Sequence, residues 1–410
     1  MKILHISGAS KDSGAGYAAL MTHNALIKNE VNSKILYLVG ENKLNSNIYH
    51  YSSGSIIKKI IRFTITNLDR LLTWIYFNKK NQIFSPGIFG LKHSNSKLFE
   101  WAEIIHIHWS NHGFININEI ESWNKPVIWT LRDMWAFTGG CHYSFDCDKY
   151  QLKCGSCAVL GSFNKHDLST LVLNNKIKYL SKSPILWVAI SNWIKNKATS
   201  STLLKNKSIP VIFSGIDCDV FKLTDINKSR DFFNLPYDKK IILIGAGNLR
   251  EKYKGFEYVI NTLNVIDKDY LIVTFGSGQI NKSEIPQKII NLGYIRNSKE
   301  LSKLYNSADV FFAPSIAEAF GKTFAEAQSC GLPVLCFDET GPAEIVEHLK
   351  SGYISKFKSE TDLLNGINFC LSTDFNRSYI SKRAMKLFDI NKIATDYIKL
   401  YKKSFSKTKN

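Results

Sequence analysis

Short apolar runs alternate with longer amphipathic stretches along almost the whole chain, and this alternation limits the possible folds more than any other feature. Strands that alternate with helices predict parallel sheets covered by helices on their faces. At 410 residues the chain is too long for one hydrophobic core, so the pattern predicts an α/β protein with two doubly wound, Rossmann-like domains. The predicted strands are Ile3–Ser7, Ser33–Leu38, Ile104–His108, Val127–Leu131, Ile185–Ile190, Ile241–Ala246, Leu271–Phe275, Val310–Ala313 and Val334–Phe337.

The domain boundaries follow from the same pattern. We expect an N-terminal domain over 1–180, a linker near 175–185, a C-terminal domain over 181–385 and a separate helical segment over 386–410. Such sheets bind ligands at the carboxyl ends of their strands. The predicted helices include Tyr17–Lys28, Phe256–Asn264, Ser298–Ser307, Thr323–Ser329 and Asn391–Phe405.

The chain is basic, with 53 Lys and Arg against 35 Asp and Glu and a net charge of +18. The excess is concentrated in 56–80, with six basic residues and one acid, and in 372–410, with ten and three. Lys outnumbers Arg 45 to 8, so compositional drift is one explanation. Attraction to anionic lipid head groups, worth ~1 kcal/mol per basic residue, is the interpretation we favour. No nucleic-acid-binding module is recognisable, so nucleic acid is not an expected partner.

The stretch Ile56–Phe77 is the longest apolar region, but its lysines and arginines prevent it from spanning a bilayer. It reads as an amphipathic helix that touches a membrane or a lipid acceptor, or equally as a core-packing helix with a basic outer face. Residues Met1–Leu4 read as a strand and not as the start of a signal peptide. We therefore expect a cytoplasmic protein, soluble or peripheral on the inner face of the membrane.

The segment from Glu318 to Glu326 carries the clearest chemical signal. Two carboxylates flank a Phe-Gly-Lys-Thr turn that should open a helix. A helix N-terminus offers unpaired N–H groups and a positive dipole end to a diphosphate. Glu326 can accept hydrogen bonds from a sugar diol, and Glu318 faces the same space. The arrangement suits a nucleotide-sugar better than a bare nucleotide.

Glu318-x7-Glu326, followed by Cys330–Val334 and Gly341–Val346, is similar to the donor-site signature of retaining glycosyltransferases of family 4, which have the GT-B fold. The resemblance covers nearly the whole chain. Further segments in the expected order are Met1–Ile6 with Ser13–Gly16, Val188–Ser191, Ser214–Asp217 with Phe221, Lys254-Gly255, Gly293-Tyr294 and Leu304–Asp309.

The resemblance implies two domains facing across a cleft, with the final segment crossing back to the first. It implies transfer of a sugar from a nucleoside diphosphate, UDP or GDP, to a surface-polysaccharide or polyprenyl-linked acceptor, without a metal in the chemistry. In the family's pattern Glu318 contacts the transferred sugar and Glu326 the ribose. The groups expected to hold the diphosphate are Phe320, Gly321, Lys322, Thr323 and Lys254, and those near the base are Tyr294, Ile295 and Arg296.

Two further segments are expected at the donor. Gly14-Ala15-Gly16 looks like the glycine-rich loop that approaches the donor phosphate, although a lone Gly-x-Gly is often only a turn. Many relatives carry an arginine where Asn248 stands, so half of the usual cationic clamp is missing. Arg250 or Lys252 is a candidate to replace it.

Candidates for the acceptor side follow the strands of the first half. Arg132 stands where many relatives have a histidine that contacts the transferred sugar; it is a candidate to bind acceptor phosphate or the departing diphosphate, or it forms a surface pair with Asp133. Asp133 is itself a candidate on the acceptor side, where it would orient a neighbouring group. His106 and His108 share one face of their strand. They are acceptor-site groups, together with His112, or core histidines.

A cysteine-rich loop over 135–160 resembles a loop found in a subgroup of exopolysaccharide glycosyltransferases. Structural zinc, free thiols and disulfides are all open, and disulfides are the least favoured because no export signal is apparent. The four candidate ligands are Cys141, Cys147, Cys154 and Cys157.

Other functions remain open alongside the glycosyltransferase. A GT-B epimerase or phosphorylase shares the architecture, and a basic polysaccharide-assembly or nucleic-acid-binding protein without catalysis would also fit the charge. The departures at Asn248 and Arg132 keep the non-catalytic alternative open.

Overall fold

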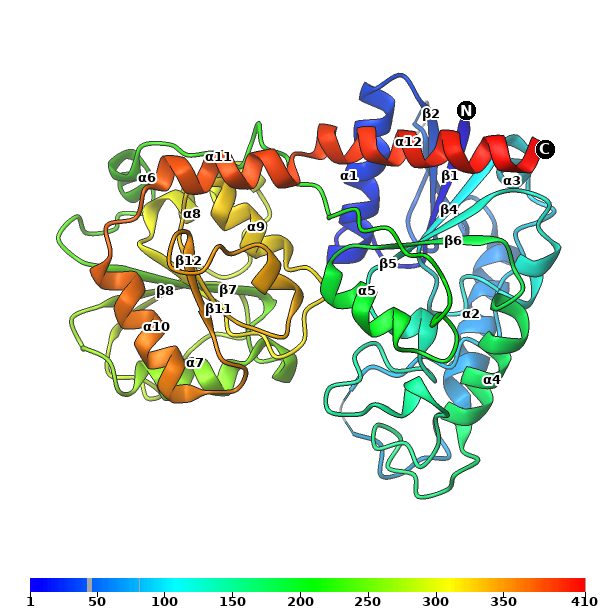
Figure 1. Ribbon diagram of the computed structural model, residues 1–410, viewed down its shortest axis with the longest axis horizontal. Coiled ribbons are helices and arrows are strands. Elements are labelled where there is room, and N and C mark those ends of the chain that lie inside the picture. The colour runs from blue at the N-terminus through cyan, green and yellow to red at the C-terminus, as the bar shows by residue number, and fades with distance from the viewer. Residues whose placement is uncertain (43–45, 81, 410) are drawn as a thin grey trace. The chain divides into compact units, whose positions relative to one another are not determined.

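The computed structural model describes residues 1–42, 46–80 and 82–409 and divides into two compact units (Figure 1). Unit 1 comprises Met1–Gly215 and Asn391–Asn410, and unit 2 comprises Ile216–Ile390. The last residue of the predicted C-terminal segment, Asn410, lies outside the described residues.

Unit 1 is built on a six-stranded sheet in the order β3-β2-β1-β4-β5-β6, with every neighbouring pair parallel. The strands are β1 (Lys2–Ser7), β2 (Asn32–Tyr37), β3 (Ile48–His50), β4 (Ile104–Trp109), β5 (Val127–Leu131) and β6 (Ile185–Ala189). The helices are α1 (Gly14–Lys28), α2 (Ile56–Leu71), α3 (Lys97–Trp101), α4 (Leu168–Leu180), α5 (Asn192–Thr199) and, from its second residue, α12 (Ile390–Lys409).

Unit 2 repeats the same plan with the order β12-β11-β10-β7-β8-β9, again all parallel. Helices α7 and α10 pack their buried faces on one side of this sheet, and α8, α9 and α11 contact one another on the other (Figure 1). The strands are β7 (Ile241–Asn248), β8 (Leu271–Ser277), β9 (Lys288–Asn291), β10 (Val310–Phe312), β11 (Val334–Phe337) and β12 (Gly352–Ser355). The helices are α6 (Ile226–Phe232), α7 (Phe256–Leu263), α8 (Ser298–Ser307), α9 (Lys322–Ser329), α10 (Glu360–Ser372) and α11 (Arg377–Phe388).

The strand order locates the ligand sites before any side chain is considered. In both sheets the order reverses at one point, between β1 and β4 in unit 1 and between β7 and β10 in unit 2. Doubly wound sheets bind ligands beyond the carboxyl ends of the strands at this switch point. The loops expected to bind are therefore those after β1 and β4, and those after β7 and β10.

The predicted fold class, two doubly wound sheets, is confirmed. The boundary expected after residue 180 differs from the division in the structure, which falls after Gly215. The reason is that β6 pairs with β5 and completes the first sheet. The helix predicted from Tyr17 begins earlier, at Gly14.

The chain leaves and re-enters unit 1 through adjacent segments. Ile216 pairs with Asp389 in a parallel bridge, and the Ile390 amide donates to the Ile216 carbonyl at 3.0 Å. Within unit 1, α12 packs against the sheet, because its Tyr401 and Tyr397 hydroxyls hydrogen-bond His106 and Thr130 at 2.7 and 2.9 Å. Among the described residues, no helix is both long and apolar enough to cross a membrane.

Candidate active site

The site in unit 2 forms where the loop after β7 meets the loop after β10. Gly255 ends the first loop in the left-handed region, with φ of 72°, and a Cβ there would lie 1.9 Å from the Pro314 carbonyl oxygen. The Ile316 amide donates to the Tyr253 carbonyl at 2.9 Å. Only glycine permits this approach, and it brings Lys254 beside Glu318.

Helix α9 begins at this junction. Its N-cap, Gly321, has φ of 87° and offers no side chain to the amides of the first turn. The Gly341 amide donates to the Glu318 carbonyl at 2.9 Å and fixes the loop that precedes the helix. The positive end of the helix dipole therefore opens next to the two carboxylates.

Each of these carboxylates is paired with a lysine. The Lys254 Nζ lies 2.6 Å from Glu318 Oε2, and the Lys322 Nζ lies 2.7 Å from Glu326 Oε1. Glu326 is buried and also accepts a hydrogen bond from the Tyr305 hydroxyl at 3.3 Å. The side chains of Lys254 and Glu318 keep 21% and 18% exposure, so a ligand can reach both.

One of the two cations proposed to replace the missing arginine, Arg250 on the loop after β7, is already paired. Arg250 donates to both carboxylate oxygens of Glu284 at 2.8 and 2.6 Å, and to the Gln279 carbonyl. Asn248 accepts a hydrogen bond from the Arg250 amide at 3.1 Å, which shapes the loop. This bidentate pair holds the Arg250 guanidinium when no ligand is bound, and compensation by Arg250 or Lys252 stays a prediction.

The residues predicted near the base lie in the loop after β9. Tyr294 is exposed and Ile295 half-buried, and Gly293, with φ of 68°, accepts a hydrogen bond from the Gly276 amide at 2.8 Å. This loop is at the carboxyl end of the same sheet. Their contact with the base stays a prediction.

In unit 1 the Gly14-Ala15-Gly16 segment forms the first turn of α1 and not a free loop. Ser13 caps the helix by accepting a hydrogen bond from the Gly16 amide at 3.3 Å. A Cβ on Gly16 would lie 1.9 Å from the Ser10 carbonyl oxygen, whereas one on Gly14 would meet nothing within 4 Å. Gly16 is thus required for packing, and Gly14 and Ala15 are the members open to a ligand.

Arg132 follows β5 and carries a cation with no carboxylate partner among the described residues. Its guanidinium donates to Ser214 Oγ at 3.0 Å and to His108 Nδ1 at 3.1 Å, while Nε has no partner. Burial lowers its pKa, and the acidic groups facing it are the hydroxyls of Tyr397, Tyr37 and Tyr401. The side chain is only partly exposed. A partly buried cation without a counter-ion is a place where an anion gains affinity.

Three buried histidines stand behind Arg132. Among the described residues, His5, His106 and His108 are the only group of three or more His, Cys, Asp or Glu whose ligand atoms converge within 4.8 Å. The contacts do not fit a metal, because His5 Nδ1 pairs with His108 Nε2 at 2.8 Å and His106 bonds Tyr401 and Thr130. Only His5 Nε2 is left unpaired. Burial holds the pKa of all three well below the usual range, so they are neutral.

This packing changes the interpretation of His108 and His106. His108 is fully buried and orients Arg132. It therefore does not reach an acceptor, and of the two alternatives the core histidine is the one that fits. His106 is a core histidine. His112 sits after β4 with φ of 59°, and burial, followed by the charges of Arg70 and His142, lowers its pKa to about 4.

Asp133 organises the aromatic groups beside Arg132. It accepts hydrogen bonds from His142 Nδ1 at 2.7 Å, from Trp109 Nε1 at 3.0 Å and from the Trp135 amide at 2.9 Å. Burial opposes its ionisation, but the His142 charge and these hydrogen bonds hold its pKa below the usual value. Asp133 therefore acts as an orienting group, and in the described part of the chain no ion pair or hydrogen bond joins it to Arg132.

The cysteine-rich loop is compact but does not form a closed metal site as folded. The sulfur atoms of its four cysteines are not a convergent group in the described part of the chain. Burial, the largest cause, raises the pKa of Cys141 to about 12 and of Cys154 to about 11. Protonated thiols are poor zinc ligands. This geometry supports the free-thiol alternative, and zinc stays a prediction.

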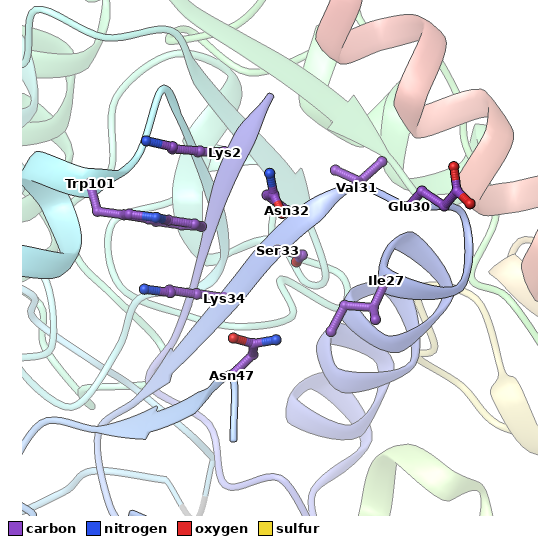
Figure 2. Close-up of a pocket in the computed structure, with 9 residues that line it drawn as sticks. All are labelled: Lys2, Ile27, Glu30, Val31, Asn32, Ser33, Lys34, Asn47 and Trp101. Atoms are coloured by element: carbon purple, nitrogen blue, oxygen red, sulfur yellow. The ribbon is translucent and has the colours of Figure 1, made fainter. Parts of the chain in front are cut away.

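A separate hollow of about 390 Å³ lies at the amino ends of β1 and β2 (Figure 2). Lys34 extends over the Trp101 ring there, with Nζ 4.2 Å from the ring centre. This is the sheet edge opposite to the switch point, so we assign it no part in the chemistry.

Sequence reasoning missed several supporting residues. Tyr305 and Ser214 lie inside quoted motifs, but their roles toward Glu326 and Arg132 depend on the fold. His5 and Tyr397 come from opposite ends of the chain, and no local pattern signals that both approach Arg132.

Comparison with known proteins agrees with this geometry. Residues 226–387 match the family described as glycosyl transferases group 1. A putative colanic acid biosynthesis glycosyl transferase of Escherichia coli, WcaC, is 22% identical, covering 89% of each chain. An N,N'-diacetylbacillosaminyl-diphospho-undecaprenol alpha-1,3-N-acetylgalactosaminyltransferase of Campylobacter jejuni is 26% identical over 59% of this chain and 68% of the relative.

The fold is shared with solved structures. HepE of Anabaena, solved in complex with UDP-glucose, superimposes with a TM-score of 0.66 at 14% identity, covering 98% of this chain and all of HepE. Two doubly wound sheets are the arrangement of the GT-B fold, and the lysine–glutamate pair lies after β7 and β10 of the second sheet. The family model covers residues 226–387, and these matches support the predicted resemblance to glycosyltransferases of family 4.

Proposed function

We propose that this protein is a retaining glycosyltransferase that moves a sugar from a UDP-sugar to a hydroxyl of a polyprenyl-diphosphate-linked glycan during surface-polysaccharide synthesis. The observation that carries the proposal is the pair of lysine–glutamate contacts at the start of α9. The names of the relatives support a polysaccharide product and a lipid-linked acceptor. The UDP-glucose complex of HepE supports UDP over GDP.

The lysine–glutamate contacts suit a ligand that is an anion at one end and a polyol at the other. When a diphosphate enters at the first turn of α9, Lys254 and Lys322 gain a stronger anionic partner than a single carboxylate. Glu318 and Glu326 are then released to accept hydrogen bonds from sugar and ribose hydroxyls. A simple phosphate would use the lysines alone, so the set is matched to a nucleotide-sugar.

The same groups supply the chemistry. The bond from the sugar C1 to the phosphate oxygen breaks, and the acceptor oxygen bonds C1 on the same face. The acceptor proton passes to the departing phosphate oxygen. In this family, retention is commonly ascribed to such a same-face attack, assisted by the donor phosphate. Lys254, Lys322 and the α9 dipole stabilise the charge that develops on the leaving diphosphate. We therefore propose chemistry without a metal, which predicts full activity in EDTA.

Arg132 is assigned to the acceptor. Among the described residues of unit 1 it is a cation without a carboxylate partner, and a polyprenyl-linked glycan carries a diphosphate. The neutral histidines behind it hold the guanidinium without competing for the anion. Arg132 thus replaces the usual histidine with an anion-binding group.

A panel of UDP-, GDP- and ADP-sugars in thermal unfolding tests the proposal. A ligand at 100 times its Kd stabilises the folded state by about 2.7 kcal/mol, so the true donor raises the melting temperature. Sugar transfer to a polyprenyl-linked acceptor should then follow in EDTA. A flat panel contradicts the proposal, and conversion of the donor to an isomer without acceptor would favour an epimerase.

A further inference from the structure

Helix α2 exposes its apolar side chains, which is unusual for a helix of a soluble domain. An amphipathic helix normally buries its apolar stripe and exposes its polar one. Here Ile56, Ile57, Ile60 and Phe63 are exposed by 76, 70, 59 and 67% of their surface. The only buried residue of the helix is its only acid, Asp69.

Polar contacts hold the helix in this orientation. Asp69 accepts hydrogen bonds from the amides of Gly87, Ile88 and Phe89 at 2.9 to 3.2 Å. On the next turn, Thr66 Oγ1 donates to the His112 carbonyl at 3.0 Å. Rotating the helix to bury its isoleucines would break these bonds and leave the amides of Gly87, Ile88 and Phe89 without their acceptor, so the outward apolar face is built into unit 1.

The apolar face continues beyond the helix. Exposed fractions are 70% for Trp74 and Ile75 and 95% for Phe77. Exposed apolar patches of this kind mark interaction sites or membrane contacts. We call Ile56–Phe77 the α2 surface.

The charge around the α2 surface selects its partner. Its basic neighbours are Lys58, Lys59, Arg62, Arg70, Lys79 and Lys80. Between residues 56 and 80 the single acid is Asp69, which faces inward. A second copy of this chain would place like charges against each other, and an anionic bilayer would neutralise them.

We propose that the α2 surface inserts into the interface of an anionic phospholipid bilayer, with the isoleucines and aromatic residues among the acyl chains and the lysines against the head groups. The inference rests on unit 1 alone. Vesicle binding is measured without donor or acceptor, so its failure is distinguishable from failure of the proposed transfer reaction.

The test uses the full chain and flotation with vesicles of phosphatidylcholine, with or without about one-third phosphatidylglycerol. We expect binding to the anionic vesicles that weakens as salt rises. Each basic residue near the surface contributes about a fivefold change in partitioning. The triple variant Lys58→Gln, Lys59→Gln, Lys79→Gln should therefore weaken binding on the order of 100-fold.

Matched controls keep the test specific. Lys228→Gln, Lys268→Gln and Lys282→Gln remove the same charge from exposed positions of unit 2 and should leave binding nearly unchanged. Phe63→Ser should reduce binding at least tenfold, whereas Val265→Ser, at a position in unit 2 with nearly the same exposure of 66%, should not. Because all these side chains are exposed, the melting temperature should stay constant.

The depth to which the α2 surface inserts into the bilayer is measured by tryptophan fluorescence. Brominated lipids should quench the wild type more than Trp74→Phe. Equal loss of binding in the α2 and unit 2 variants would overturn the proposal. So would vesicle-independent self-association that Phe63→Ser abolishes.

Discussion

Replacing Glu318 by Gln should strengthen the binding of free UDP while it abolishes sugar transfer. Without a ligand, Glu318 holds the ammonium of Lys254 at 2.6 Å, and the pair is about four-fifths enclosed. A diphosphate must draw Lys254 away from that carboxylate. A partly exposed pair is worth about 1 kcal/mol, so removing the competitor should tighten UDP binding up to about fivefold.

Lys254→Ala should act in the opposite direction. It removes a charge-assisted hydrogen bond worth about 1.5–3 kcal/mol, which weakens UDP binding by roughly 10- to 150-fold. The lone carboxylate of Glu318 then faces the diphosphate without its cation. In the Lys254→Ala background, Glu318→Gln should therefore recover more affinity than it adds to the wild type.

Isothermal titration calorimetry with UDP measures all four proteins of this double-mutant cycle. Glu257→Gln, one exposed residue elsewhere on unit 2, serves as the control for loss of an acidic charge. The reasoning fails if Glu318→Gln weakens UDP binding tenfold or more, because the carboxylate would then support the nucleotide directly. It also fails if the two substitutions act additively.

Three further predictions concern unit 1. Arg132→Gln should raise the KM for a polyprenyl-linked acceptor at least tenfold and leave UDP affinity unchanged in calorimetry, since Arg132 has no counter-ion until an anion arrives; weaker UDP binding would assign it to the departing diphosphate instead. Burial lowers the pKa of His23 and His112 to about 4. The unfolded state therefore takes up protons as pH falls below about 6.5, and each histidine removes up to about 1.4 kcal/mol of stability per pH unit between 6.5 and 4. The seven histidines whose pKa is lowered by burial all lie in unit 1, so in calorimetric scans its transition should shift down between about pH 7 and pH 5 while that of unit 2 stays in place; a common shift would contradict this. Elemental analysis of protein purified without added zinc should find no stoichiometric metal, because the four cysteine sulfurs of the loop do not converge in the described part of the chain; one zinc per chain would support the zinc alternative instead.

The central strands and one edge strand, β6, could be predicted from the sequence, and the other edge strands could not. Strands such as β1, β4, β7 and β10 are buried on both faces and read as continuous apolar runs. The missed strands β3, β9 and β12 are three or four residues long and lie at sheet edges, where fewer apolar residues are needed. The misplaced boundary has a similar cause, because an apolar run does not reveal which sheet β6 joins.

Likewise, some features of the candidate site could be predicted from the sequence and others could not. The positions of Lys254 and Glu318 could be predicted because both follow strands that flank the switch point. Their ion pair could not, since it depends on Gly255 meeting the Pro314 carbonyl. The pairing of Arg250 could not be predicted either, because its partner, Glu284, is distant in sequence.

Helix α2 shows most clearly what periodicity leaves undecided. The spacing of Ile56, Ile60 and Phe63 predicts one apolar face, but it does not say whether that face turns inward or outward. The decision rests on Asp69, whose three amide contacts are available only when the apolar face points away from the unit. One buried acid therefore separates a core helix from a surface that contacts lipid. Asp69→Asn keeps the acceptor oxygen but removes the charge, so it should weaken the contacts that hold α2 without releasing the helix. Asp69→Leu, in contrast, should free α2 to bury its isoleucines. If this variant loses vesicle binding but retains UDP affinity, membrane binding depends on the orientation of α2 and not only on its amino-acid composition.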